Sequence, residues 1–112
     1  VAGLWQDVID DLPIYDAIFF HTYPLNQEEY LKYVHGKSTF AEHFFKDAAA
    51  HLKPNGRFTY MTNEIDSLSR AHQRQLLKNF SSFSLKMVKL NIPESAKDTW
   101  WINKMAVVTA VK

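Results

Sequence analysis

The hydrophobic positions of this chain form segments of two kinds. Four segments have the three-and-four spacing of a helix: residues 4–12, 26–36, 39–52 and 68–79. Four others are short continuous or alternating apolar runs that favour strands: residues 15–22, 57–62, 83–90 and 104–111. Strands that alternate with helices imply parallel pairing, whereas the last two strands, joined by a polar loop, imply an antiparallel hairpin.

The run at residues 15–22 is the segment from which a function can be argued. Residues 17–20 are consecutively apolar, which is typical of a strand buried on both faces of a sheet. Pro24 cannot donate a ladder hydrogen bond, so strand pairing should stop before it. The carboxyl end of a central strand is the edge at which open α/β sheets bind ligands. The residues expected at this edge are His21, Thr22 and Tyr23.

Local signals mark the ends of the helices and one turn. Thr39 and Glu42 have the spacing of a capping box, in which each side chain would bond a free backbone amide of the other residue. Asp66 or Ser67 is expected to cap the last helix, because short polar side chains accept from its first amides. Residues 54–56 (PNG) predict a turn.

The composition indicates one small domain with enough apolar residues for a core. The chain has 112 residues, of which 46% are hydrophobic. The net charge of +1 gives no concentrated basic face, so no nucleic acid is expected. The chain has no cysteine, and its scattered histidines complete no zinc pattern, so no metal is expected. No apolar run has membrane-spanning length, and we expect a cytoplasmic protein with no membrane partner.

Several short stretches resemble one known family. They are residues 3–8 (GLWQDV), 15–18 (YDAI), 22–25 (TYPL) and 52–60 (LKPNGRFTY). Over nearly all its length the chain is similar to the second half of guanidinoacetate methyltransferase and its relatives. These are class I S-adenosylmethionine-dependent methyltransferases. The GLW and TYPL pair at this separation is the more specific part, since an LKPNG turn before a strand is common to many class I methyltransferases.

The resemblance implies a particular α/β architecture. The family fold is a Rossmann-like, three-layer αβα domain with a seven-stranded sheet, and its last two strands form an antiparallel hairpin. Residues 1–112 would form a single partial domain, the carboxyl-terminal half of that fold. The glycine-rich half is expected to be absent, because no Gly-x-Gly occurs here. We therefore expect the fragment alone to be inactive, and expect it to form a homodimer or to associate with the missing amino-terminal half.

The resemblance also assigns cofactor contacts. Leu4 and Trp5 match the position beside the adenine ring of S-adenosylmethionine, where aliphatic and aromatic side chains supply an apolar slot. The alternative for Trp5 is a role in core packing, because large aromatic side chains are usually buried. His21 matches a position that faces the methyl donor.

His21 stands where the guanidinoacetate enzyme has an aspartate that holds the substrate guanidinium. Histidine lacks two parallel acceptors, but it can accept a proton as methyl transfer proceeds, and we expect His21 and Tyr23 to act in catalysis. Thr22, Asn63 and Glu64 are expected to contact substrate, and Glu64 can offer the carboxylate that His21 does not. The alternatives are a hydrogen-bonded histidine at a strand end and an exposed loop glutamate.

The combined hypothesis is an S-adenosylmethionine-dependent N-methyltransferase that acts on a small guanidino or amino substrate. Methyl transfer needs an aligned, desolvated and unprotonated nucleophile, so the absence of cysteine does not count against it. One alternative is an oxygen or carbon acceptor on the same scaffold, because fold does not fix function. Another alternative is a non-catalytic α/β module whose open flanks serve assembly.

Overall fold

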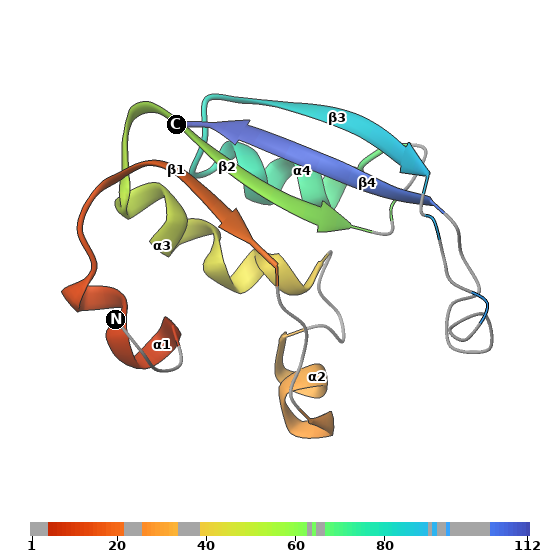
Figure 1. Cartoon of the computed structure of the whole chain (residues 1–112), viewed down its shortest axis with the longest axis horizontal. Coiled ribbons are helices and arrows are strands. Elements are labelled where there is room, and N and C mark those ends of the chain that lie inside the picture. The colour runs from red at the N-terminus through yellow and green to blue at the C-terminus, as the bar shows by residue number, and fades with distance from the viewer. Residues whose placement is uncertain are drawn as a thin grey trace.

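The structure is a computed structural model that describes residues 5–21, 26–33, 39–62, 64, 67–89, 91, 94 and 104–112. Its strands are β1 (Tyr15–Phe20), β2 (Leu52–Thr62), β3 (Ser82–Lys89) and β4 (Lys104–Val111) (Figure 1). Its helical segments are α1 (Trp5–Val8), η1 (Ile9–Asp11), α2 (Gln27–Tyr33), η2 (Phe40–Phe44), α3 (Phe45–Ala50) and α4 (Arg70–Leu77), where η marks a 3-10 helix. Within the described residues, no helix is long and apolar enough to cross a membrane.

The four strands form one mixed sheet in the order β1-β2-β4-β3. β1 and β2 are parallel, and Phe20 lies opposite Tyr60. β2 and β4 are antiparallel, as are β3 and β4, and Val108 of β4 lies between Tyr60 and Leu85. The predicted parallel pair and the predicted antiparallel closing pair are both confirmed. The last strand also has the bounds expected from the sequence.

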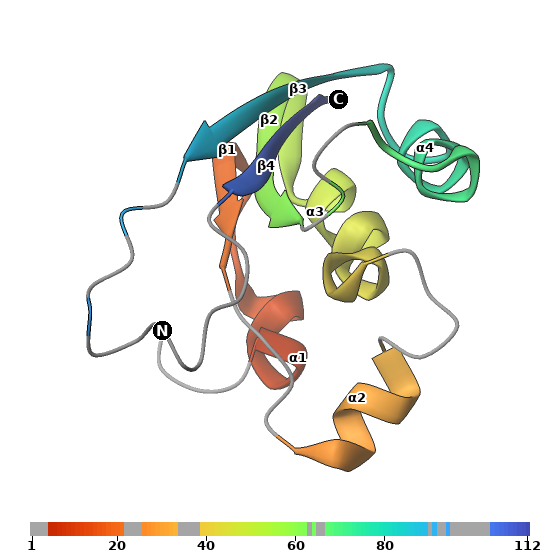
Figure 2. The same cartoon turned by 90° about the vertical axis from the view of Figure 1, so that its right-hand side faces the viewer.

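The described helices that pack on the sheet lie on one of its faces. Figure 2 shows α3 and α4 on the same side of the strands, while α2 lies apart, beyond the carboxyl end of β1. On the other face, alternate positions of β2 and β4 are only half-buried, among them Met61 and Val107. The described part of the chain therefore has two layers and four strands. The seven-stranded, three-layer form stays a prediction.

The core lies between the strands and α3 and α4. Phe58 and Tyr60 of β2 are fully buried, and Phe45 of α3 packs on both rings at centroid distances of 6.0 and 5.3 Å. Phe80, just after α4, stacks on Phe58 at 5.6 Å. Full burial of an aromatic or aliphatic side chain stabilises the fold by about 1.5–3 kcal/mol, so this aromatic layer sets how the helices dock. The predicted apolar face of residues 40–52 is largely confirmed, since its buried members include Phe45.

The prediction that residues 17–20 are buried on both faces is wrong. β1 is an edge strand of the described sheet, with β2 as its neighbour. Phe20 is buried, but Ala17 is exposed and 61% of Phe19 is exposed. A continuous apolar run indicates that a segment can be covered on both faces, but it does not supply the elements that cover it.

The two predicted helix caps also differ from the structure. Thr39 precedes η2 with extended backbone, but its side chain makes no capping hydrogen bond, and Glu42 Oε2 is buried with no partner among the described residues. The capping box is therefore not formed, and the helix starts as a 3-10 segment instead. α4 is capped by Ser69, whose hydroxyl accepts from the His72 backbone N–H at 3.2 Å, and not by Ser67. Asp66 lies outside the described residues.

The predicted turn at residues 54–56 lies within the bounds of β2, where regular pairing is interrupted. Between Tyr15 and Ala17 of β1, the facing strand advances from Leu52 to Arg57. Asn55 has a φ of 67°, a left-handed conformation that asparagine tolerates. A Cβ on Gly56 would lie 2.8 Å from the Lys53 carbonyl oxygen and 3.1 Å from that of Asp16. The turn therefore needs a residue without a side chain at position 56.

We expect Gly56→Ala to lower the free energy of unfolding of the intact protein by about 1–3 kcal/mol, because both contacts are with backbone oxygens that cannot rotate away. Asn55→Gly is the matched control in the same turn. It should change stability by less than about 1 kcal/mol, since glycine adopts positive φ without strain. Urea unfolding measures both variants. Equal stability of Gly56→Ala and the unchanged protein would show that the close approach is not a constraint.

Candidate functional site at the carboxyl edge of the sheet

The parallel pairing of β1 and β2 brings two of the predicted site residues to one edge. Because the strands run in the same direction, both carboxyl ends lie on the same side of the sheet. His21 directly follows β1, and Glu64 is the second residue after β2. The edge therefore carries one imidazole and one carboxylate from adjacent strands.

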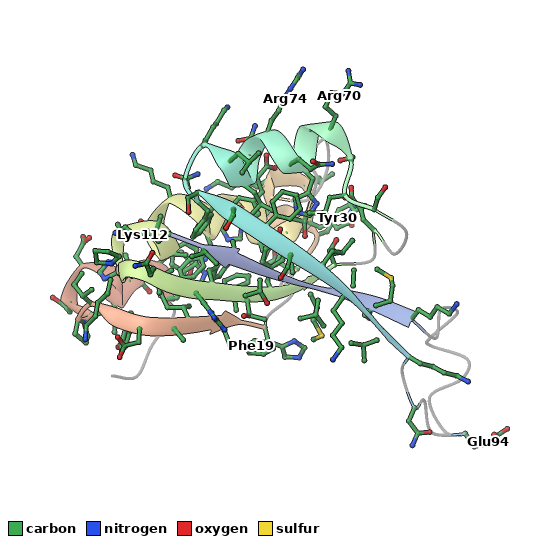
Figure 3. All side chains as sticks on the ribbon, turned by 90° about the horizontal axis from the view of Figure 1, so that it is seen from above. Phe19, Tyr30, Arg70, Arg74, Glu94 and Lys112 are labelled. Carbon is green, nitrogen blue, oxygen red and sulfur yellow. The ribbon has the colours of Figure 1, made fainter. Side chains whose placement is uncertain are left out.

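His21 is exposed at this edge. Its ring lies 5.9 Å from that of Phe19, with the two rings stacked at 21°. Since residues two apart on a strand share a face, His21 lies on the Phe19 side of β1 and not on the core side with Phe20. Figure 3 shows Phe19 on the side of the sheet away from α4, whose Arg70 and Arg74 point outward. Stacking on Phe19 positions His21 at this edge.

Trp5 of α1 is half-buried in an aromatic cluster below the end of β1. Its ring meets Phe44 edge-on at 4.7 Å and lies 5.4 Å from the ring of His43. Phe20 stacks on the same Phe44 at 4.7 Å. The packing alternative raised for Trp5 is thus observed, and the same contacts place its partly accessible ring next to the strand that ends at His21.

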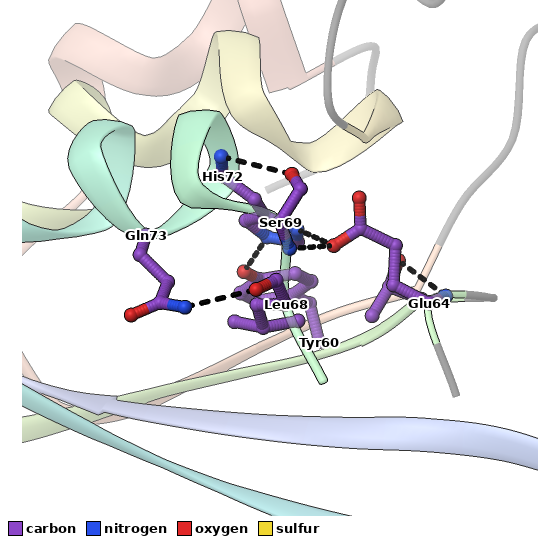
Figure 4. A network of polar contacts seen from close by, with 7 residues as sticks. Tyr60, Glu64, Leu68, Ser69, His72 and Gln73 are labelled. Carbon is purple, nitrogen blue, oxygen red and sulfur yellow. Dashed lines mark hydrogen bonds and ion pairs between the residues drawn. The ribbon is translucent and has the colours of Figure 1, made fainter. Parts of the chain in front are cut away.

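Two groups hold the carboxylate of Glu64 at this edge (Figure 4). Its Oε2 accepts from the Ser69 backbone N–H at 3.0 Å and contacts His72 Nδ1 at 2.9 Å. On the other side of the imidazole, His72 Nε2 is hydrogen-bonded to the Tyr60 hydroxyl. His72 is fully buried, whereas the side chain of Glu64 is 23% exposed. The network therefore runs from the core to the rim.

The environment favours a charged Glu64 and a neutral Tyr60. Partial burial acts to raise the pKa of Glu64, but the hydrogen bonds from Ser69 and His72 outweigh it and hold that pKa below its ordinary value. Burial, and then the negative charge of Glu64, raise the pKa of the Tyr60 hydroxyl far above its ordinary value. The site therefore presents one negative charge, located on a carboxylate at the rim.

His72 is the site residue that sequence reasoning missed. It lies within the helix predicted at residues 68–79, and no role follows for it from the sequence pattern. The available signal was its spacing: His72 is three residues after a serine that can cap, so it lies in the first turn of α4 and faces the end of β2. Sequence alone did not show that Tyr60 and Glu64 would lie on either side of its ring.

The other predicted site residues lie outside the described residues. They are Leu4, Thr22, Tyr23 and Asn63. Their roles at the cofactor or substrate therefore stay predictions. In the described ranges, no group of three or more histidine and acidic side chains is arranged to hold a metal ion.

Comparisons with solved structures identify the fold. A methyltransferase from Pyrococcus furiosus superposes with a TM-score of 0.52 at 18% identity, covering 90% of this chain and 42% of that one. A precorrin-6y C5,15-methyltransferase from Geobacter metallireducens GS-15 superposes with a TM-score of 0.59, also at 18% identity, covering 100% of this chain and 52% of that one. The chain thus spans about half the length of the structures it matches. Its fold is one that methyltransferases use.

The sequence comparison is more specific. The family model for guanidinoacetate N-methyltransferase matches residues 1–105. The chain belongs to this family, and the resemblance noted from its sequence motifs is confirmed. A search of curated proteins finds no match.

We expect ionised Glu64 to stabilise the folded protein at neutral pH and to lose this effect in acid. Its pKa is lowered on folding, so the stabilisation is present above the unfolded value of about 4.3 and is lost as the pH falls through the lower folded value. Between about pH 5 and about pH 3, the unfolding free energy of the unsubstituted protein should therefore fall more steeply than that of the Glu64→Gln variant. Urea unfolding at several pH values measures the difference, because the other carboxylates are common to both proteins.

Glu28→Gln, at an exposed position of α2, is the control for loss of one carboxylate. Its pH profile should run parallel to that of the unchanged protein. A Glu64→Gln profile that also runs parallel would mean that the network does not favour the charged carboxylate.

Proposed function

We propose that this chain is part of an S-adenosylmethionine-dependent methyltransferase that methylates a nitrogen of a small guanidino or amino substrate. The observation that carries the proposal is the charged Glu64 carboxylate, held by Ser69 and His72 at the carboxyl edge of parallel strands that also carries His21, in a member of the guanidinoacetate N-methyltransferase family. A guanidinium or ammonium ion needs a carboxylate for charge-assisted hydrogen bonds. Glu64 supplies one, and its ordered geometry reduces the entropy lost on binding.

In this proposal different residues of the edge bind the substrate and accept its proton. Glu64, with Thr22 and Asn63, binds and orients the substrate. His21 accepts a proton from the reacting nitrogen, with Tyr23 beside it. No covalent intermediate with the protein is required.

The cofactor would lie against Leu4 and Trp5 and would supply an electrophilic methyl group on a sulfonium. Trp5 fits this position in two respects: Phe44 and His43 hold its ring, and part of the ring remains accessible. A flat apolar surface of this kind suits an adenine ring. The chain supplies only one wall of such a site, since it contains no glycine-rich loop.

The remaining walls would come from an amino-terminal half, which would extend the sheet to seven strands in three layers. This part of the proposal is supported by β1, which is an edge strand with an exposed Phe19, and by the sheet face that no described helix covers. An unpaired strand edge with apolar side chains is a ready surface for another strand. Without that half, or a second copy in its place, we expect the chain to be inactive.

Calorimetric titration of the intact protein with S-adenosylmethionine and S-adenosylhomocysteine tests the central proposal. We expect saturable heat with both compounds and an increase in melting temperature, because a ligand that binds only the folded state stabilises it. Trp5→Ala should weaken both effects, whereas Arg70→Ala, on the outer side of α4, should change neither. No heat and no thermal shift would favour the second candidate, a non-catalytic module that serves assembly. The exposed Phe19 on the edge strand supports that alternative.

Exchanging His21 for the family's aspartate tests the substrate class. We expect His21→Asp to raise kcat/KM for guanidinoacetate by about tenfold or more, because a second carboxylate can accept paired hydrogen bonds from the guanidinium. His21→Asn has similar shape without charge and should not produce the gain. Methyl incorporation into guanidinoacetate measures both. If His21→Asp brings no increase, the acceptor is not a guanidino acid, and hydroxyl and carbon acceptors become the candidates to assay.

A further inference from the structure

The most unusual group in the described structure is the fully buried imidazole of His72. A buried polar side chain is costly unless its donors and acceptors are satisfied. His72 meets this condition, because Tyr60 bonds Nε2 and Glu64 bonds Nδ1. In another ion pair of the described residues, Lys53 to Asp16, both side chains are mostly exposed. The buried pair of His72 and Glu64 therefore differs in kind from the exposed ion pair.

The chemistry of the two partners fixes the direction of both hydrogen bonds when the ring carries a single proton. An ionised carboxylate only accepts hydrogen bonds, so Nδ1 carries the proton and donates it to Glu64 Oε2. Nε2 then has a free lone pair and accepts from the Tyr60 hydroxyl. Since burial keeps that hydroxyl protonated, the direction of both bonds is set. The result is a series of two hydrogen bonds, one donated by Tyr60 to His72 and one donated by His72 to Glu64.

This series of hydrogen bonds leaves the Oε1 atom of Glu64 without a bond from a described residue. The hydrogen bonds from Ser69 and His72 both go to Oε2 of Glu64, and none goes to Oε1 from a described residue. Figure 4 shows the second oxygen of Glu64 pointing away from these partners. A carboxylate held by one oxygen can accept a cationic N–H donor with the other, in a fixed direction and with little loss of entropy.

We propose that His72 is a positioning residue for substrate: it holds Glu64 by Oε2 so that Oε1 accepts an N–H of an ammonium or guanidinium ion at the carboxyl edge of the sheet. Tyr60 acts one step further back, because it fixes the ring of His72. This inference rests on the proposed methyl-transfer function for its kinetic consequence. Its structural content, that His72 sets the state of Glu64, can be tested without any activity.

Two substitutions at position 72 separate positioning from packing. The amide nitrogen of His72→Asn can take the place of Nδ1 and still donate to Glu64, whereas the longer His72→Gln can replace Nε2 but not Nδ1. With methylguanidine and ethylamine as acceptors in the intact protein, we expect His72→Gln to raise KM by about tenfold, which corresponds to about 1.4 kcal/mol, with little change in kcat. His72→Asn should stay within about threefold of the unchanged protein. Arg74→Ala, on the outer side of α4, is the control and should change neither constant.

The carboxyl carbon of Glu64, followed by NMR during a pH titration, gives the readout that does not depend on catalysis. We expect its midpoint to rise toward the ordinary glutamate value in His72→Gln and to stay low in His72→Asn. Tyr60→Phe, which keeps the His72 ring but removes its second partner, serves if either variant at position 72 does not fold. It should raise the Glu64 midpoint by a smaller amount.

The two readouts distinguish the possible failures. A shifted midpoint in His72→Gln without methyl transfer to any acceptor in the unchanged protein would retain the positioning role and overturn the proposed function. Methyl transfer with equal KM values for His72→Gln and His72→Asn, or an unmoved Glu64 midpoint, would overturn the positioning role and leave the proposed function standing.

Discussion

Burial of the His72 side chain constrains this end of the molecule more than any other polar contact. An imidazole removed from water needs a hydrogen bond at each nitrogen, and both partners come from β2 and the residues that follow it. α4 can therefore dock on the sheet only where His72 lies between Tyr60 and Glu64. Phe45 of α3 packs against the same histidine and tyrosine, so both helices are fixed by one arrangement. A polar requirement of the core thus determines the position of a charge at the rim.

The strands could be predicted from the sequence where the local pattern and the tertiary environment agree. β4 is nearly continuously apolar and has a paired strand on each side, and its bounds were expected correctly. The pattern of β1 was misleading, because four apolar residues in a row indicate two covered faces, and the described structure covers one. Caps were also poorly predicted. Thr39 has the correct type and spacing for a capping box, but its segment begins as a 3-10 turn and its side chain makes no capping hydrogen bond.

The site was partly predictable, for a reason that lies in topology. Residues that follow parallel strands meet at one edge whatever their packing, so His21 and Glu64 could be assigned to the same rim from the chain order. The orientation of Glu64 could not be assigned, because it depends on a residue eight positions later in a separate element. The stacking of His21 on Phe19 was likewise hidden, since it follows from the exposure of β1. Contacts between elements decide these details, and they leave no periodicity in the sequence.

The proposed methyl-transfer function depends most on where the cofactor binds. A crystal structure of the intact protein with S-adenosylhomocysteine and methylguanidine tests this directly. We expect the sulfur at the carboxyl ends of β1 and β2, the adenine against Trp5, and the guanidinium on the free oxygen of Glu64. A cofactor bound at the opposite edge of the sheet, or a guanidinium far from Glu64, would contradict the account.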